Sequence, residues 1–176
     1  MLFDFALTLI QGQRIRGAIK AIGDEDWSRL TQLVEEGLDP NQILPTKSLP
    51  DIRRQRANQT TPLLAMSMQR LGGEGAKAQI KRDTYCFLLA KGGDPFLAVG
   101  NDKRNCFVHL TNIRNLDGIR LIAASGIDVR NAHIEDNQHD WEEGRQWALE
   151  YRAQMDARDI QAQTTKNDTA RPRPRF

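Results

Sequence analysis

The chain has few cysteines and few aromatic residues for its length. Cys86 and Cys106 are the only cysteines among 176 residues, which excludes a disulfide framework and a zinc site built from cysteine alone. Aromatic residues make up 6%, which favours a thin or elongated body. No run reaches the roughly 18 apolar residues that a membrane span needs. The apolar opening also carries Asp4 where a signal peptide has a basic residue. We therefore expect a soluble, cytoplasmic protein without a membrane partner.

A strong charge of one sign and the common catalytic motifs are absent as well. The 25 Lys and Arg residues oppose 23 Asp and Glu residues, which leaves a formal net charge of +2. There is no phosphate loop, nucleophile elbow or zinc-metalloprotease helix. His133 and His139 lie among acidic residues, but their spacing fits no defined metal motif. We expect no enzyme activity, no cofactor and no metal.

Three similar segments are present instead, at residues 30–41, 85–96 and 119–130. Each has apolar residues seven, four and three positions before a glycine, which places them on one face of a helix. The glycine lies where a helix can end in a left-handed residue, and an aspartate follows two positions later. The glycines are Gly37, Gly92 and Gly126, and the aspartates are Asp39, Asp94 and Asp128.

A second helix is expected upstream of each stop. Thr61 can cap a helix whose first turn contains Pro62. Residues 108–111 take the equivalent place in the third repeat, and residues 18–22 do so in the first. Each repeat is thus predicted to contain a helix, a turn, a second helix, a glycine stop and an extended loop.

These strings resemble the ankyrin repeat. The matching segments are TTPLLAM, VHLT, EEGLDPN, KGGDPF and SGIDVRN, and the resemblance covers roughly residues 14 to 160. It implies an all-α solenoid of helix-turn-helix units with finger loops, capped at both ends. It also implies that His109 hydrogen-bonds backbone between repeats. The segment Trp147–Tyr151 resembles the opening of a fourth, degenerate repeat.

The spacing locates two insertions. Asp94 and Asp128 are 34 positions apart, close to the ankyrin period of about 33, whereas Asp39 and Asp94 are 55 apart. The excess falls between Asn41 and Thr61 and in the glycine-rich turn at residues 72–75. We expect a single domain at 1–163, with repeats at about 14–42, 60–96, 105–131 and 146–163. A disordered basic tail is expected at 164–176.

The two ends differ from the middle. The apolar residues between Leu2 and Ile10 are expected to cover the first repeat or to dimerise the protein. Residues 139–163 are expected to form a long polar helix with apolar side chains turned inward. These side chains are Trp141, Trp147, Leu149, Tyr151 and Met155.

The loops carry opposite charges. Residues 42–60 have a net charge of +3 and contain the exposed-looking Ile43 and Leu44, whereas residues 132–146 have a net charge of −4. Opposite charges at two loops would orient a partner of matching polarity. The candidate partner-binding residues are Arg53, Arg54, Arg56, Phe96, Asn101, Lys103, Arg104, Glu135, Asp136, Asp140 and Trp141.

Several functions remain open at this point. The first is a monomeric, non-enzymatic module that binds one dedicated protein partner. Its fold resembles that of bacterial immunity proteins, which implies inhibition of a toxin or effector. The alternative is a nucleic-acid or ribonucleoprotein binder that uses the Arg-rich loop and the tail. The loops can also be ordinary solvated segments, and an enzyme site assembled from distant residues is a third possibility.

Overall fold

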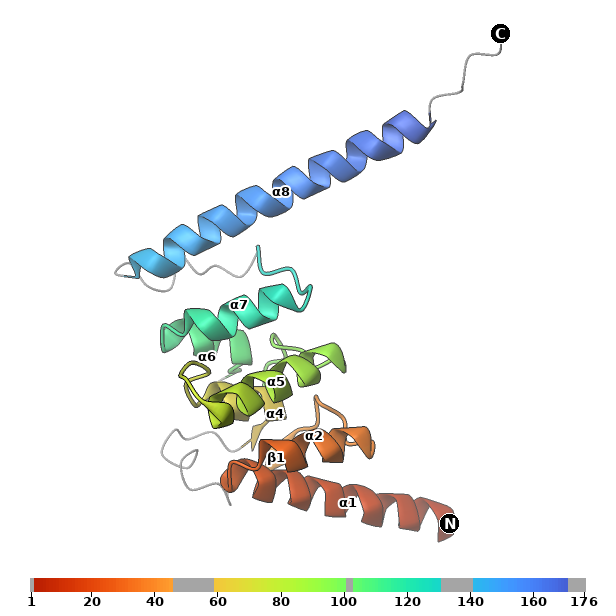
Figure 1. The fold of residues 1–176 in the computed structure, drawn as a ribbon. Helices are drawn as coiled ribbons and strands as arrows, with labels where there is room; N and C mark the ends of the chain where they lie inside the picture. The colour runs from red at the N-terminus through yellow and green to blue at the C-terminus, as the bar shows by residue number, and fades with distance from the viewer. Residues whose placement is uncertain (1, 46–58, 101–102, 131–140, 171–176) are drawn as a thin grey trace. The chain divides into compact units, whose positions relative to one another are not determined.

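The computed structural model describes residues 2–45, 59–100, 103–130 and 141–170 and shows a mostly helical chain (Figure 1). The helices are α1 (Leu2–Gly23), α2 (Trp27–Glu35), α4 (Pro62–Ser67), α5 (Ala76–Ala90), α6 (Cys106–Asn112), α7 (Leu116–Ala124) and α8 (Glu142–Ala170). Two short strands, β1 (Leu44–Pro45) and β2 (Gln59–Thr60), pair antiparallel. The predicted helical class is confirmed. None of the described helices is long and apolar enough to cross a bilayer.

The chain divides into two compact bodies, where the sequence predicted one domain through residue 163. The N-terminal body is Met1–Val129 and the C-terminal body is Arg130–Phe176. The first contains α1 to α7, and the second contains α8.

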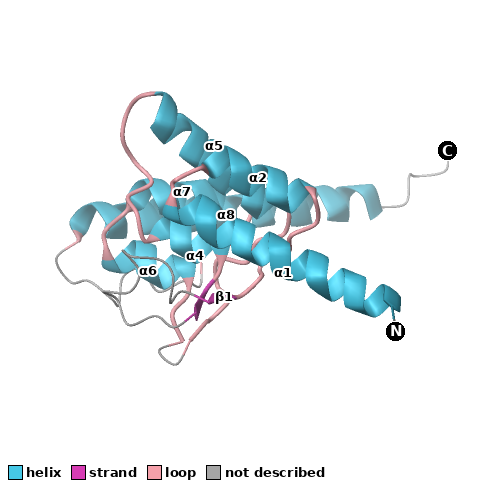
Figure 2. Ribbon diagram, turned by 90° about the horizontal axis from the view of Figure 1, so that it is seen from below, coloured by secondary structure: helices cyan, strands magenta, loops and turns pink. Residues whose placement is uncertain are grey.

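The helices of the N-terminal body form two layers. Helices α1, α4 and α6 contact one another in that order, and α2, α5 and α7 do the same in the second layer. Each first-layer helix also packs against the second-layer helix that follows it, so α1 meets α2, α4 meets α5 and α6 meets α7. Figure 2 shows α2, α5 and α7 on one side of this body and α4, α6 and β1 on the other. The core lies between the layers and contains Leu30, Leu33, Leu63, Leu88, Leu110 and Ile119, each at most 2% exposed.

Polar contacts also join neighbouring helix pairs. The Thr31 and Thr84 hydroxyls lie 3.2 Å apart and connect α2 with α5. The Tyr85 hydroxyl lies 2.7 Å from the Cys106 sulfur and connects α5 with α6. Both contacts link one helix pair to the next.

The predicted helix stops are confirmed. Gly37, Gly92 and Gly126 have φ values of 100°, 89° and 88°, the left-handed region that glycine enters without a Cβ clash. Asp39 Oδ1 then accepts a hydrogen bond from the Asn41 N–H at 2.8 Å. Asp94 Oδ1 accepts one from the Phe96 N–H at the same distance. Two of the stops therefore continue into the same type of turn.

The predicted helix start at Thr61 is confirmed too. The Thr61 hydroxyl accepts a hydrogen bond from the Leu64 N–H at 3.2 Å, and Pro62 opens helix α4. Asn105 caps α6 in the same way, because its side chain accepts from the Val108 N–H at 2.7 Å. Each cap satisfies a backbone donor that the first helical turn would leave unpaired.

Two helix-helix turns share a feature that the sequence does not reveal. Glu25, between α1 and α2, has φ 55°, and Arg114, between α6 and α7, has φ 54°. The residue after each one caps the next helix: Asp26 accepts from Arg29 N at 2.9 Å and Asn115 accepts from Gly118 N at 3.0 Å. The two turns therefore have the same local structure although neither uses glycine.

Helix α1 begins earlier than the repeat pattern predicted. The apolar segment between Leu2 and Ile10, expected to precede the first repeat as an extra segment, is continuous with the helix that ends at Gly23. No proline interrupts it, and only Gly12 weakens the helix before residue 14. Leu9 and Ile10 are 51% and 42% exposed, so these two side chains are only partly covered by the first repeat.

The C-terminal body differs more from the prediction. Helix α8 extends to Ala170, past the expected end at 163 and into the expected tail, because the first proline after it is Pro172. Helix α8 is a single helix and not a degenerate helix-turn-helix repeat. Leu149 is 59% exposed instead of turned inward. Residues 171–176 of the expected tail lie outside the described residues.

Ion pairs and a ring stack organise this body. Arg130 Nη1 lies 3.2 Å from Asp156 Oδ1 and 2.6 Å from Asp159 Oδ2. The Trp147 and Tyr151 rings stack with centroids 5.2 Å apart. The segment that enters the body at Arg130 is thus attached to the middle of α8.

Candidate interaction surface

Two helices of the first layer, α4 and α6, are each preceded by a pair of short strands. In one, Leu44 on β1 pairs with Thr60 on β2, directly before the α4 cap Thr61. In the other, Val99 N donates to the Arg104 carbonyl at 2.8 Å, directly before the α6 cap Asn105. We call these the first finger, with described residues 43–45 and 59–60, and the second finger, with described residues 96–100 and 103–104. A short antiparallel strand pair therefore leads into the helix cap at both α4 and α6.

Asn41 joins the loops from which the fingers arise. Its side-chain Nδ2 donates to the Gly92 carbonyl at 2.8 Å, and its Oδ1 accepts from the Asp94 N–H at 2.7 Å. One amide side chain thus satisfies two backbone groups of the neighbouring loop. These bonds fix the base of the first finger against the base of the second.

The second finger carries three of the predicted partner-binding residues. Phe96 is 37% exposed, and its ring centroid lies 5.3 Å from that of the buried Phe107. Lys103 is exposed at a left-handed position, φ 47°, and Arg104 is half-buried in the strand pair. The second finger therefore contains an aromatic side chain that packs on Phe107, together with two cationic residues.

Most of the other predicted residues are not placed by the structure. Arg53, Arg54, Arg56, Asn101, Glu135, Asp136 and Asp140 all lie outside the described residues. The basic loop of the first finger and the acidic loop before α8 remain expectations from the sequence.

Trp141 and Leu44 are both buried: the predicted inward position of Trp141 is confirmed, whereas the expected exposure of Leu44 is wrong. Trp141 is only 6% exposed, and its ring packs so closely on Gly144 that a Cβ there would lie 2.5 Å from the indole. It therefore does not present its ring to a partner. Leu44, expected to be exposed beside Ile43, is completely buried because alternate strand residues point to opposite faces. Ile43 is 44% exposed, as expected.

Val108 is an apolar residue of this region that the sequence did not single out. It lies in the first turn of α6 and is 38% exposed, whereas Leu64, at the same position in α4, is 1% exposed. In the sequence, the only indication of this difference in exposure is that Val108 replaces Leu64 at the equivalent repeat position. Exposed Ile43, Phe96 and Val108 give the finger region an apolar component.

The ionisable groups beneath the second finger are held neutral. Burial lowers the pKa of His109, and the positive charge of Arg104 lowers it further. Its Nε2 atom is buried and has no hydrogen-bond partner among the described residues, so the expected bond to backbone is not found at that atom. Burial also raises the pKa of Cys106 to about 11, so its sulfur is a thiol at neutral pH.

A separate cavity of about 420 Å³ lies beside the turn between α1 and α2. Its lining includes Asp24, Glu25, Asp26, Trp27, Lys77 and Ile80. Lys81 Nζ lies 5.3 Å from the centre of the Trp27 ring, and burial lowers the pKa of this lysine. The cavity lining thus contains three carboxylates and one lysine. In the described parts of the chain, no three His, Cys, Asp or Glu side chains are grouped to hold a metal.

No family model matches the chain, and no curated protein or solved structure matches it. Its function has to be inferred from its own residues, above all from the two fingers and the Asn41 link between them.

Proposed function

We propose that the N-terminal body is an ankyrin-like repeat stack that acts as a non-enzymatic binding module for one dedicated protein partner. The two-layer order of helices, the left-handed glycine stops and the matching turns at Glu25 and Arg114 support the repeat architecture. Stacked helix pairs of this kind offer extended surfaces to partners.

The observation that carries the proposal is the pair of linked fingers. Asn41 holds their bases together, so a partner meets a preformed surface and less conformational entropy is lost on binding. Protein interfaces are enriched in aromatic residues and arginine, and the second finger carries the exposed Phe96 and the half-buried Arg104.

The charge of the fingers indicates an acidic partner surface. Lys103 and Arg104 belong to the second finger, and the sequence of the first finger contains Lys47 and the arginines at 53, 54 and 56. Complementary charges of this kind accelerate association and orient the partner. An inhibitory role against a toxin or effector with an acidic cleft follows from the family resemblance, and fold analogy is its support.

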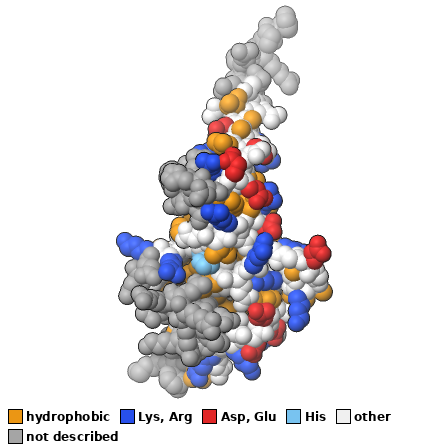
Figure 3. Space-filling view, turned by 90° about the vertical axis from the view of Figure 1, so that its left-hand side faces the viewer, with side chains coloured by type: hydrophobic (Ala, Val, Ile, Leu, Met, Phe, Trp, Pro, Cys, Tyr) orange, Lys and Arg blue, Asp and Glu red, His pale blue; other side chains and the backbone are white. Residues whose placement is uncertain are grey.

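The distribution of charge on the surface favours a protein partner over a nucleic-acid partner. On the face shown in Figure 3, blue and red side chains are interspersed among the described residues. A protein that binds phosphate backbones usually presents a continuous basic patch or stripe. The fingers also combine their cations with apolar side chains, which suits a protein surface.

The test is affinity capture from native lysate with three forms of the full chain, in about 0.15 M salt to screen weak surface contacts. The forms are the wild type, a finger variant (Phe96→Ala with Lys103→Glu) and a control variant (Ile80→Ala with Lys77→Glu). Ile80 is 43% exposed and Lys77 is exposed, so the control makes matched changes outside the fingers.

The proposal expects one stoichiometric protein that survives nuclease treatment, stays with the control and is lost from the finger variant. All three forms should melt at similar temperatures. Capture that disappears with nuclease would favour the nucleic-acid alternative. Equal capture by the finger variant would remove the second finger from the interface.

A further inference from the structure

The first part of helix α1 is apolar and extends away from the rest of its body. Residues Leu2 to Ile10 contain one charged residue, Asp4. Figures 1 and 2 both show this part of α1 continuing beyond the other helices of the N-terminal body. Helix α1 packs into the core further along, through the buried Ala18, Ala21 and Ile22. Leu9 and Ile10 are 51% and 42% exposed, so these two side chains contribute little to the core.

The outward face of α1 becomes basic after the apolar part. Leu9, Gln13, Arg16 and Lys20 follow at helical spacing and are all exposed, so they share one face. Arg14 does not belong to this face, because its guanidinium lies against Gly37. The exposed charges on this stretch of the helix are therefore the two cations Arg16 and Lys20.

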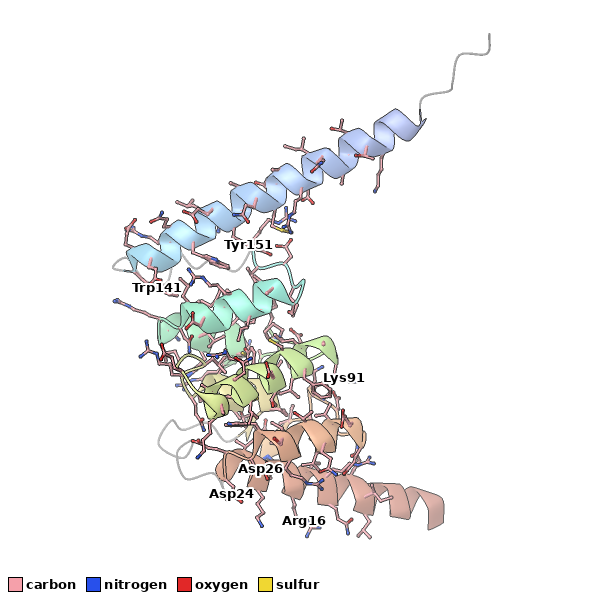
Figure 4. All side chains as sticks on the ribbon, in the orientation of Figure 1. Arg16, Asp24, Asp26, Lys91, Trp141 and Tyr151 are labelled. Carbon is pink, nitrogen blue, oxygen red and sulfur yellow. The ribbon has the colours of Figure 1, made fainter. Side chains whose placement is uncertain are left out.

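The face ends in an acidic turn. Asp24, Glu25 and Asp26 follow α1 directly and are exposed. Figure 4 shows Arg16 on the helix between its N-terminal part and the labelled Asp24 and Asp26. At about 1.5 Å per residue, Arg16 lies about 9 Å beyond Ile10 along the axis, and Asp24 lies about 21 Å beyond it.

This order of zones matches an anionic lipid surface. At such a surface the acyl chains lie deepest, the phosphates next, and the aqueous phase last. Asp24 lies about 6 Å, roughly one helical turn, beyond Lys20 along the axis, on the side of the aqueous phase. Apolar, basic and acidic residues would each meet the layer that suits their chemistry.

We propose that α1 docks the protein on an anionic lipid surface, with the apolar part at the acyl boundary and Arg16 and Lys20 at the lipid phosphates. Two such signals are needed, because a single short apolar element gives only marginal membrane binding. The sequence expectation of no membrane partner rested on the lack of a spanning segment, which an interfacial helix does not need.

The same order of zones disfavours a second copy of the chain as the occupant. Antiparallel pairing of two α1 helices would bring the apolar part of one toward the acidic turn of the other. Parallel pairing would align Arg16 and Lys20 with their own copies, and like charges repel. A lipid surface satisfies both the apolar and the basic residues at once.

The experiment is co-sedimentation of the full chain with vesicles of phosphatidylcholine alone and with vesicles containing about 30% phosphatidylserine. We expect binding to the anionic vesicles that weakens as salt is raised. Arg16→Gln with Lys20→Gln should weaken this binding by about fivefold per charge removed. Leu9→Asp with Ile10→Asp should abolish it. Ile160→Asp is the matched control, since Ile160 is 66% exposed on α8, and it should bind like the wild type.

Several results would overturn the proposal. These are failure of the wild type to bind anionic vesicles, equal binding by the Asp variant, or binding insensitive to the two cations. A dimer that the Asp variant converts to a monomer, without vesicle binding, would instead identify a second copy as the occupant. If the Asp variant failed to fold, the charge variant would still decide the matter. The finger variant with Phe96→Ala should bind vesicles normally, which separates this proposal from the proposed partner surface.

Discussion

The Asn41 side chain accepts a hydrogen bond from the Asp94 backbone N–H at 2.7 Å, across 53 positions of sequence. The same amide donates to the Gly92 carbonyl, so replacing it leaves two backbone groups without their partners. We expect Asn41→Ala to lower the free energy of unfolding by about 1–2 kcal/mol. Urea denaturation would measure the loss. Gln42→Ala is the control, because the Gln42 side chain donates to the adjacent Ile43 carbonyl and to no distant group among the described residues. An equal loss in both variants would show that the link does not stabilise the loops.

Glu25 occupies a left-handed conformation, φ 55°, which is unfavourable for a residue with a Cβ. Glu25→Gly should relieve this cost, although glycine also adds entropy to the unfolded chain. The balance predicts a gain of up to about 1 kcal/mol, visible as a higher melting temperature. Asp24→Gly, one position earlier and without positive φ, should lower the melting temperature. Destabilisation by Glu25→Gly would show that Glu25 contributes more through its charge than it costs through its backbone.

The neighbouring glycines Gly92 and Gly93 are needed for different reasons. A Cβ at Gly93 would lie 2.6 Å from Leu63 Cδ1 and 2.8 Å from the Leu88 carbonyl oxygen. Because a backbone atom cannot move aside easily, Gly93→Ala should cost about 2–3 kcal/mol. Gly92 has open space but φ 89°, so Gly92→Ala should cost about 1 kcal/mol through the backbone alone. Chemical denaturation of both variants would reveal the order, and the reverse order would contradict the packing of Gly93 on α4.

The two cysteines should differ in reactivity. Cys106 is 2% exposed, and its pKa is raised to about 11, whereas Cys86 is half-buried with a less strongly raised pKa. Because the thiolate is the reactive form, a maleimide at neutral pH should modify Cys86 in the folded protein and reach Cys106 only after unfolding. Mass spectrometry after proteolysis would assign the sites. Cys86→Ser should leave the folded protein unreactive, and rapid labelling of that variant would contradict the burial of Cys106.

His109 should make stability depend on pH. Its folded-state pKa lies below the ordinary value of 6.5, chiefly through burial. The unfolded chain therefore binds a proton first as pH falls below about 6.5, and the free energy of unfolding decreases until the folded-state pKa is passed. His109→Gln should lose this contribution. Melting temperatures at pH 7.5 and 5 should differ more for the wild type than for the variant, and an equal difference would assign the pH dependence to other groups.

Local signals predicted much of the fold. The stops at Gly37, Gly92 and Gly126 and the cap at Thr61 could be identified because each depends on the conformational range or hydrogen bonding of one residue type. The helical class followed from the spacing of apolar residues around them. These features are decided within a few residues, so neighbouring sequence is sufficient.

Other features depend on contacts that sequence alone does not specify. Nothing in the residue type of Glu25 or Arg114 indicates a left-handed turn, since packing of the flanking helices imposes it. The length of α8 was missed because a polar segment without proline reads equally well as helix or as tail. Trp141 was assigned to a partner surface because an aromatic residue in an acidic loop gives no sign of the Gly144 beneath it.

At the candidate surface, the sequence predicted which residues of the second finger matter but did not predict how they are arranged. Phe96, Lys103 and Arg104 were selected by residue type and loop position, both of which are visible in the sequence. The strand pair at Val99 and Arg104 involves a single bridge, too short to produce an alternating pattern. The link through Asn41 joins residues far apart in the chain and could not be inferred from either loop alone.

The polar contacts between helix pairs have a consequence for how the N-terminal body loses its structure. Thr31 with Thr84 and Tyr85 with Cys106 each span the boundary between one pair and the next. When one pair opens, its neighbour loses both apolar cover and a hydrogen-bond partner, so a partly opened stack is less stable than its intact pairs would suggest. In arrays governed by nearest-neighbour coupling, such boundary terms make opening cooperative. We therefore expect the described helix pairs to melt as one unit, although each is built largely from its own local signals.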